Sequence, residues 1–325
     1  MKNKIIIVTG DPNSINSEII YKSWKKIDQS LKKKIFFISN LNLLKEQFKK
    51  LNYKLDLIKV RDFNDKVNNF NKLRIMNINL KFKNPFKVSQ NSASKFVKSS
   101  LSLAHKLAIS GELINVINCP INKKLLKKEK IGVTEYLTSK CKLKNHSVVM
   151  LIKGRKLSVC PITTHLDLRE ISRQIKPALI IKKINTINKE FKRYFKKKPF
   201  IGILGLNPHN AELRKNSEEV KSIKPAINNL KKKGIKIDGP LVADTLFINN
   251  YKKYDVIVGM YHDQVLIPVK TLDKFNAINI TLGLKYLRAS PDHGTAENLI
   301  SKKISNPTSM IECIKFVSKY GKVSS

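Results

Sequence analysis

The sequence has few cysteines, and none lies close to another. Cys119, Cys141, Cys160 and Cys313 form no C-x-x-C pair, which argues against a zinc knuckle or a disulfide framework. Separate thiols of this kind are typical of a reducing compartment. Long hydrophobic runs are also missing, because the N-terminal KNKIIIVTGDP is too short for a signal peptide and no window reaches membrane-spanning length. We therefore expect a cytoplasmic protein without a membrane segment.

Acidic residues are scarce, with 24 Asp and Glu against 64 Lys and Arg and a net charge of +40. A field of this sign attracts polyanions, as a nucleic-acid or membrane-surface binder would require. The lysine runs at 32–34, 196–198 and 231–233 are short, however, and no basic arm alternates with aromatic residues. Lys, Asn and Ile are abundant everywhere, so compositional drift explains the charge better than nucleic-acid binding, which stays an alternative.

Glycine and proline are sparse, at 12 residues each, so composition marks no domain boundary in the 325 residues. This length suffices for about two domains with a substantial core. Short β-branched runs alternate with amphipathic segments, which favours an α/β fold with a largely parallel sheet. Strands are expected at 4–8, 34–39, 54–60, 113–118, 147–152, 200–204, 255–258 and 277–281, and helices at 92–110, 177–195 and 218–233.

Three further segments lack the expected signals. Residues 62–86 are rich in Asn, Lys and Phe with weak periodicity, and we expect an irregular connection there. Neither GDPNSI after the first strand nor GILGL at 202–206 matches the G-x-G-x-x-G pattern of dinucleotide-binding folds. A dinucleotide would therefore need another type of site.

Three of the six histidines follow an apolar strand at its C-terminal end. His262 follows DVIVGMY, His209 follows GILGLNP, and His165 follows the short apolar segment CPITT. The carboxyl ends of parallel strands meet at one edge of a sheet, where α/β folds bind ligands, so these imidazoles could converge. The alternative is that each histidine only caps a strand end or bonds to the backbone.

Three imidazoles with room for substrate oxygens are typical of an open, catalytic metal site. Imidazole donors suit zinc, cobalt or nickel better than magnesium. Asp263 beside His262 could orient the ring or act as a base.

The other histidines lie in different contexts. His105 falls within an amphipathic helical pattern and His146 within a polar loop, so both are expected to be structural or exposed. His293 lies in SPDHGTAENL, where a Gly-Thr turn is expected to open a helix and offer N–H groups to a phosphate. The candidate cofactor-binding residues are therefore Asp292, His293, Gly294 and Thr295.

In chain order, the motifs resemble those of the 4-hydroxythreonine-4-phosphate dehydrogenase family, NAD-dependent enzymes of pyridoxal 5′-phosphate biosynthesis. Each motif alone is weak, whereas together and in order they are specific, and they extend nearly from end to end. The motifs are GDP at Gly10, PINK at Pro120, TEYL at Thr134, TTH at Thr163, GLNPH at Gly205, GPLVADTLF at Gly239, YHDQ at Tyr261, NITLGL at Asn279 and DHGTA at Asp292.

The resemblance assigns roles to individual residues. It implies that His165, His209 and His262 hold the metal. It also implies that the substrate is contacted by Thr134, Lys270, Asn279 and Arg288. Lys and Arg side chains at these positions could clamp a phosphate and a carboxylate.

The resemblance also implies two α/β/α domains with a cleft between them, as in isocitrate and isopropylmalate dehydrogenases. One domain would comprise residues 1–125 with 285–325. The other would comprise residues 126–284 and carry most metal ligands and the dimer interface. The family implies a homodimer with a shared active site, NAD or NADP, one divalent metal per subunit (zinc, cobalt or magnesium) and a small phosphorylated substrate.

The chain departs from the family pattern in three places. Val133 stands where the family has a substrate-contacting histidine, and losing such a bond to a charged group would cost roughly 1.5–3 kcal/mol of binding. The loop after the first strand carries Asn13, Ser14, Asn16 and Ser17 where the family tends to glycine-rich residues. The segment NPHNAELRKNSEEV is also less glycine-rich than expected. These departures put the exact substrate in doubt.

By resemblance, the reaction oxidises 4-phosphohydroxy-L-threonine to a β-keto acid that decarboxylates to 3-amino-2-oxopropyl phosphate. A metal would lower the pKa of the substrate hydroxyl as hydride passes to NAD. Asp263, Asp244 and Lys123 are unranked candidates for the proton acceptor. Two alternatives stay open, a paralogous dehydrogenase for another phosphorylated hydroxy acid, such as a four-carbon sugar-acid phosphate, and a non-catalytic nucleic-acid-binding relative.

Overall fold

The computed structural model describes residues 4–65, 67–110, 114–126, 132–143, 147–248 and 250–321. The chain divides into two compact units, unit 1 (Met1–Leu143 with Leu284–Ser325) and unit 2 (Lys144–Gly283). The sequence-based boundary had placed residues from 126 onward in the second domain. Helix α5 (Val133–Lys140) clusters with unit 1 instead, because it packs on α4 (Gln90–Ile109) and on the 3₁₀ turn η1 (Lys123–Leu126).

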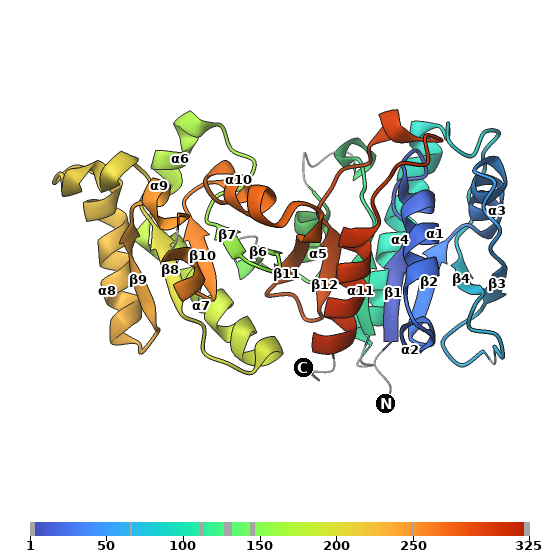
Figure 1. Cartoon of the computed structure of the whole chain (residues 1–325), viewed down its shortest axis with the longest axis horizontal. Helices are drawn as coiled ribbons and strands as arrows, with labels where there is room; N and C mark the ends of the chain where they lie inside the picture. Colours follow the sequence, from blue (N-terminus) through green and yellow to red (C-terminus); the bar gives the residue numbers. More distant parts are fainter. Residues whose placement is uncertain are drawn as a thin grey trace. The chain divides into compact units, whose positions relative to one another are not determined.

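Unit 1 contains a parallel sheet in the order β3-β4-β2-β1-β5-β12. Its strands are β1 (Lys4–Val8), β2 (Ile35–Ser39), β3 (Leu57–Val60), β4 (Leu73–Asn77), β5 (Ile114–Asn118) and β12 (Arg288–Pro291). Its other helices are α1 (Asn16–Lys26), α2 (Gln29–Lys32), α3 (Leu41–Lys50), η8 (Glu297–Leu299) and α11 (Thr308–Tyr320). Helices α4 and α11 both pack against β1 (Figure 1). Covered strands of this kind have continuous apolar runs, as the IIIV of β1 does.

Unit 2 contains a mixed sheet in the order β11-β6-β7-β10-β8-β9. Its strands are β6 (Val149–Lys153), β7 (Ser158–Pro161), β8 (Ile201–Leu204), β9 (Ile237–Leu241), β10 (Val256–Gly259) and β11 (Ile278–Leu282). Strand β6 runs antiparallel to β11 and β7, whereas β7, β10, β8 and β9 are parallel neighbours. The parallel sheet expected from the sequence is therefore interrupted by one antiparallel strand.

The helices of unit 2 include three that carry or follow the histidine motifs. These are α6 (Leu168–Gln174), the turn η4 (Pro208–Leu213) and α10 (His262–Asp273). The others are α7 (Pro177–Glu190), η3 (Phe191–Phe195), η5 (Glu219–Ile223), α8 (Lys224–Lys232), α9 (Ala243–Leu246), η6 (Asn250–Lys253) and η7 (Lys274–Asn276). Val265 and Val269 of α10 belong to the apolar core of this unit, which holds the helix against the sheet. No helix in the described part of the chain is long and apolar enough to cross a membrane.

The expectation of an irregular connection at 62–86 was wrong, because β4 lies within it and pairs with both β2 and β3. Arg74 interrupts the apolar pattern of this strand, so hydrophobic periodicity did not predict a strand here. The guanidinium is buried, lies 4.0 Å from the ring centroid of Phe36 and donates to the carbonyls of Lys32 and Ile35. The charged residue therefore belongs to the strand.

Candidate functional site

The strands that precede the three singled-out histidines are neighbours in unit 2. Strands β7, β10 and β8 are adjacent and parallel, so their carboxyl ends lie at one edge of the sheet. His165 follows β7, His262 follows β10 as the first residue of α10, and His209 follows β8 within η4. This edge, with its three histidine-bearing strand ends, is called the imidazole edge below.

Two of the three rings lie close together. The ring centroids of His165 and His262 are 5.6 Å apart, and the rings are tilted by 36°. His262 Nδ1 lies 2.7 Å from Asp263 Oδ1. The tautomer with its proton on Nδ1 donates to this carboxylate and leaves Nε2 with a lone pair directed elsewhere, as in many metal-binding histidines. Asp263 thus fits the orienting role among the two that the sequence offered.

The donor set of the imidazole edge fits a borderline-soft divalent metal, since it consists of imidazoles with one ring oriented by a carboxylate. His165 and His209 have exposed side chains. Among the described residues of one chain, no group of three or more His, Cys, Asp or Glu side chains is close enough to hold a metal ion.

The backbone at His209 has an unusual conformation. Each of residues 209–213 has φ between 48° and 57°, in the left-handed region that costs ordinary residues roughly 1–2 kcal/mol each. The side-chain amide of Asn210 donates to the carbonyl of Pro240 (3.0 Å), which ties this turn to β9. Such strain persists only where the surroundings hold it, and it gathers at functional sites.

A buried carboxylate holds the entrance to this turn. Glu219, fully buried, accepts hydrogen bonds from the backbone N–H groups of Leu206 and Asn207, both at 2.8 Å. The side-chain amide of Asn207 adds a bond of 3.0 Å. Burial alone would raise the pKa of Glu219, but the bonds from Asn207 and Leu206 outweigh burial and lower it. The carboxylate is therefore charged at neutral pH and fixes the approach to His209.

The remaining predicted residues of unit 2 have diverse surroundings. Lys270 is exposed on α10, and Asp244 is exposed on α9, where it accepts from the N–H of Thr245 (2.9 Å). Asn279 lies on β11 opposite Ile152. Its Oδ1 is buried and accepts no hydrogen bond from the part of the chain that the structure describes. A buried acceptor without a donor is uncommon and marks Asn279 as a place where a ligand could donate.

In unit 1, two of the predicted substrate contacts meet. Arg288 on β12 is buried, and its NH1 group lies 3.3 Å from the hydroxyl of Thr134 in the first turn of α5. Its Nε donates to Asn118 Oδ1 at 2.7 Å, a partner that the sequence did not suggest. Burial lowers the pKa of Arg288 to about 10, so the guanidinium remains charged. Val133 opens α5 directly before Thr134.

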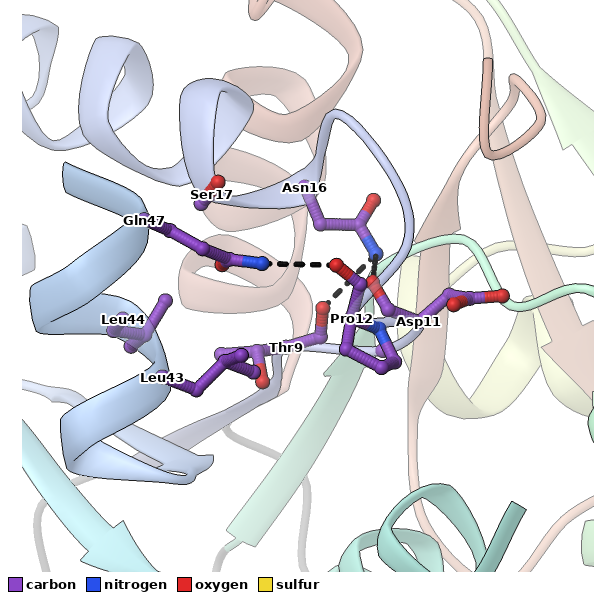
Figure 2. Close-up of a pocket in the computed structure, with 9 residues that line it drawn as sticks. Thr9, Asp11, Pro12, Asn16, Ser17, Leu43, Leu44 and Gln47 are labelled. Carbon is purple, nitrogen blue, oxygen red and sulfur yellow. Dashed lines mark hydrogen bonds between the residues drawn. The ribbon is translucent and has the colours of Figure 1, made fainter. Parts of the chain in front are cut away.

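The segment after β1 is held by side chains that replace glycines of the expected pattern (Figure 2). Gly10 has φ of +76°, and a Cβ there would lie 2.6 Å from the carbonyl oxygen of Pro120, so only glycine fits. Asn16 donates to that same carbonyl at 2.9 Å. The carboxyl group of Asp11 points away from Gln47 (Figure 2).

Asp11 is a further charged group that the sequence analysis did not single out. The side chain is 4% exposed and accepts from the backbone N–H groups of Asn13 (2.9 Å) and Asn122 (3.2 Å). Burial raises the pKa of Asp11 to about 6; the charge of Glu297 adds to this, while the two N–H bonds oppose it. The signal in the sequence was the GDP motif itself, which marks the end of β1.

Three parallel strand ends of unit 1 place predicted residues at one edge. Lys123, exposed in η1, follows β5, and the cofactor candidates at 292–295 follow β12, which pairs with β5. The N–H of Ile15 at the start of α1 donates to the carbonyl of Thr295 (3.1 Å), so the segments after β1 and β12 are in contact. Arg288 is the first residue of β12, but its side chain bonds to Asn118, the last residue of β5. We call this the charged edge of unit 1, defined by Asp11, Lys123, Arg288 and residues 292–295.

The prediction that Asp292, His293, Gly294 and Thr295 precede a helix was wrong. Only the three-residue turn η8 follows, and α11 does not begin until Thr308. Ala296, Ser301 and Lys303 have positive φ, which breaks a right-handed helix. A phosphate at 292–295 would therefore not lie on a helix N-terminus.

The remaining histidines are His105, His146 and His293. His105 is buried in α4, with Nδ1 3.2 Å from the hydroxyl of Tyr286, which confirms a structural role. His146 lies outside the described residues. His293 Nδ1 lies 2.9 Å from the carbonyl oxygen of Gly294.

Comparison with known proteins shows the family to which the chain is similar. The chain matches the family described as "Pyridoxal phosphate biosynthetic protein PdxA" over residues 30–317. It is 36% identical over 319 residues to the 4-hydroxythreonine-4-phosphate dehydrogenase of Sulfurihydrogenibium sp., covering 96% of both chains. It is also 36% identical over 324 residues to the enzyme of the same name from Aquifex aeolicus, covering 98% of both.

Two further comparisons bear on fold and substrate. The crystal structure of 4-hydroxythreonine-4-phosphate dehydrogenase from Klebsiella pneumoniae superposes with a TM-score of 0.87 at 26% identity, covering 99% of this chain and 100% of the other. A protein of Oceanobacillus iheyensis, provisionally named D-threonate 4-phosphate dehydrogenase, is 32% identical over 326 residues and covers 96% of both chains. The α/β fold expected from the sequence is confirmed.

Proposed function

The chain belongs to the pyridoxal phosphate biosynthetic family of the 4-hydroxythreonine-4-phosphate dehydrogenases, and from this we propose that it oxidises 4-phosphohydroxy-L-threonine with NAD or NADP and one divalent metal. The product would be a β-keto acid that decarboxylates to 3-amino-2-oxopropyl phosphate. A dehydrogenase role in this biosynthesis follows from the family; the cofactors and the decarboxylation are our proposal. The single observation that supports it best is the imidazole edge, where adjacent parallel strands present His165, His209 and His262.

We propose that these three histidines hold zinc, cobalt or magnesium, with zinc or cobalt favoured by the imidazole donors. When bound, the metal supplies Lewis acidity to the substrate hydroxyl, and the nicotinamide supplies a hydride acceptor. Asp263 orients His262 through the bond of 2.7 Å. Since this carboxylate is engaged there, Asp244 and Lys123, both exposed, remain the candidates for the proton acceptor.

We propose substrate-binding roles for Arg288 in unit 1 and for Asn279 and Lys270 in unit 2. Arg288 is a fixed, charged guanidinium whose Nε and NH1 already bond to Asn118 and Thr134, and it suits a carboxylate or phosphate as partner. The orphaned Asn279 Oδ1 can accept from a substrate ammonium or hydroxyl group. Lys270 supplies an exposed cation for the phosphate. The cofactor is assigned to residues 292–295 at the charged edge, without a helix dipole.

We further propose a homodimer in which a second copy completes the imidazole edge. One chain alone does not bring three metal-binding side chains together among the described residues. Large apolar side chains are exposed in the same segments as the histidines, namely Leu166, Leu168, Leu213 and Ile267. Exposed apolar residues gathered in the segments of a functional site often mark an interface. A cytoplasmic location stays a prediction, in keeping with four buried, free cysteines.

The second candidate substrate is a phosphorylated hydroxy acid such as D-threonate 4-phosphate. Val133 favours it, because valine offers no hydrogen bond where the family has an imidazole. Val133 opens α5 next to Thr134, which contacts Arg288, so the change lies beside the groups proposed to bind substrate. The Oceanobacillus relative carries the corresponding name.

The test is NAD reduction by the purified protein with each of the two substrates, with and without a chelator. We expect reduction with 4-phosphohydroxy-L-threonine that a chelator removes and cobalt or zinc restores. Faster turnover of the hydroxy acid would favour the paralogous activity. Failure of both substrates, together with salt-dependent binding of random DNA, would instead support the nucleic-acid-binding alternative.

A further inference from the structure

Beyond the histidines themselves, we infer that Gln264 and Thr163 are positioning residues that hold the three strand ends of the imidazole edge in fixed register. The inference rests on the proposed metal site. It concerns two residues that touch neither substrate nor metal in the proposal and that act through the backbone of Met260 and Gly205.

The backbone ladder of the sheet does not extend to the histidines. Strand β10 pairs with β8 as far as Val258 opposite Ile203, and with β7 as far as Gly259 opposite Pro161. All three histidines lie further along the chain, in segments that diverge from the sheet. Their mutual positions therefore depend on bonds made after the ladder ends.

On the β7 side, Thr163 makes those bonds. Its N–H donates to the carbonyl of Met260 at 3.1 Å, and its hydroxyl donates to the same carbonyl at 2.7 Å. Thr163 is 5% exposed, so both bonds are shielded from water. The segment that leads to His165 is thereby fixed to the segment that leads to His262.

On the β8 side, the bond is made by one side chain. Gln264 Oε1 accepts from the N–H of Met260 at 2.7 Å, and its Nε2 donates to the carbonyl of Gly205 at 2.8 Å. A side-chain amide suits this position because it accepts and donates at once, which neither a carboxylate nor an apolar side chain does. Gly205 begins the segment that leads to His209. Gln264 therefore braces the His262 segment against the His209 segment.

The packing around Gln264 is tight at both strand ends. A Cβ at Gly259 would lie 2.9 Å from Gln264 Oε1 and 2.5 Å from Val265 Cγ1, and a Cβ at Gly205 would overlap Asn210 Oδ1. Both strand ends thus lack side chains where the amide and its neighbours pass. Met260, the shared partner of Thr163 and Gln264, is fully buried. Together these residues form one hydrogen-bonded belt across three strand ends.

The test measures cobalt(II) affinity and the visible absorption spectrum of bound cobalt(II) in the full-length protein. Gln264→Met removes both bonds at similar volume, and we expect about 10- to 100-fold weaker binding with an altered spectrum, the usual range for groups that orient metal ligands. Gln264→Glu keeps the bond from Met260 and loses the one to Gly205, so we expect an intermediate loss. Thr163→Val keeps the backbone bond and should lose least.

The matched control is Thr271→Val, an exposed residue of the same helix whose hydroxyl donates to the carbonyl of Ile267 within α10. It should bind cobalt(II) like the wild type with the same spectrum. Wild-type affinity and spectrum in Gln264→Met would overturn the inference while leaving the metal site standing. A wild-type protein that binds no cobalt(II) would overturn the proposed function and the inference with it. If Gln264→Met does not fold, Gln264→Glu provides the test. Wild-type cobalt(II) binding in Gln264→Glu would equally contradict the positioning role of Gln264.

Discussion

The two units present the same structural element, an edge of parallel strand ends, with opposite chemistry. The charged edge of unit 1 carries a guanidinium and a carboxyl group that are almost fully buried, Arg288 at 3% and Asp11 at 4% exposure. The imidazole edge of unit 2 carries exposed imidazoles at His165 and His209. The first edge buries a guanidinium and a carboxyl group, whereas the second exposes two imidazoles.

This difference shows two ways to fix the residues of a polar site in position. Arg288 is fixed by direct bonds from its own side chain to Asn118 and Thr134. On the imidazole edge, bonds of Gln264, Thr163 and Glu219 fix the backbone segments that lead to the histidines. A buried charge needs partners at once because desolvation is costly. An exposed imidazole does not, so its partners can be supplied by a ligand.

We expect the largest effect from a substitution that removes one histidine of the imidazole edge. His209→Ala should abolish cobalt(II) binding and lower turnover about a thousandfold or more, since a metal supplies several kcal/mol of transition-state stabilisation. Isothermal titration and NAD reduction measure the two quantities, and sedimentation should show a dimer for both variant and wild type. Glu212→Ala, an exposed neighbour in the same left-handed turn, is the control and should keep both activities. Full turnover in His209→Ala would remove the basis for the metal site.

The second effect concerns pH and belongs to the charged edge. The pKa of Asp11 is raised from 3.8 to about 6, so the folded state disfavours its ionised form. Below pH 3.8 the group is protonated in both states, and stability is lost as pH rises through about 6. Asp11→Asn does not ionise, so its stability relative to the wild type should rise by roughly 3 kcal/mol between about pH 4 and about pH 8.

Urea unfolding of both proteins at several pH values measures this difference. Asparagine also changes the bonds with Asn13 and Asn122, but that change is the same at every pH and cancels from the slope. A difference between the two proteins that does not vary with pH would show that Asp11 is not held in a disfavoured ionised form.

We expect the smallest of the three effects from a substitution in the charged edge that should weaken catalysis without changing metal binding. Arg288→Lys should lower kcat/KM about 30- to 150-fold, because lysine cannot bond Asn118 and Thr134 while facing a substrate anion. Cobalt(II) affinity should not change, since the imidazole edge is untouched. Arg74→Lys is the matched control, another buried arginine of unit 1 whose pKa burial lowers to about 10. It should destabilise the fold and leave kcat/KM unchanged. If Arg288→Lys and Arg74→Lys lowered kcat/KM equally, the role of Arg288 would be structural and not in substrate binding.

Much of this architecture was predictable from the sequence because it rests on apolar patterning. Strand β1 was expected at 4–8 and lies at Lys4–Val8, and the three histidines were expected at parallel strand ends. Two of the strands that were not expected share one cause. Strands β4 and β12 each contain a buried arginine, Arg74 or Arg288, and a charge inside a short strand hides it from a periodicity reading.

The misses at the sites have a different cause. Gln264, Asp11 and Glu219 act through partners distant in sequence, so their roles appear only when the strands are assembled. The helix expected after Thr295 failed because backbone conformations with positive φ at ordinary residues leave no clear mark in composition. Local sequence patterns therefore predict helices and strands, whereas the roles of site residues depend on tertiary contacts.

The left-handed turn at 209–213 also limits which amino-acid substitutions this segment can accept during evolution. β-Branched residues are the least compatible with its backbone conformation, and glycine, asparagine and aspartate are the most compatible. Substitution by β-branched residues next to His209 should therefore be poorly tolerated even at the exposed positions Glu212 and Leu213. A surface segment that would ordinarily diverge freely is constrained by its handedness.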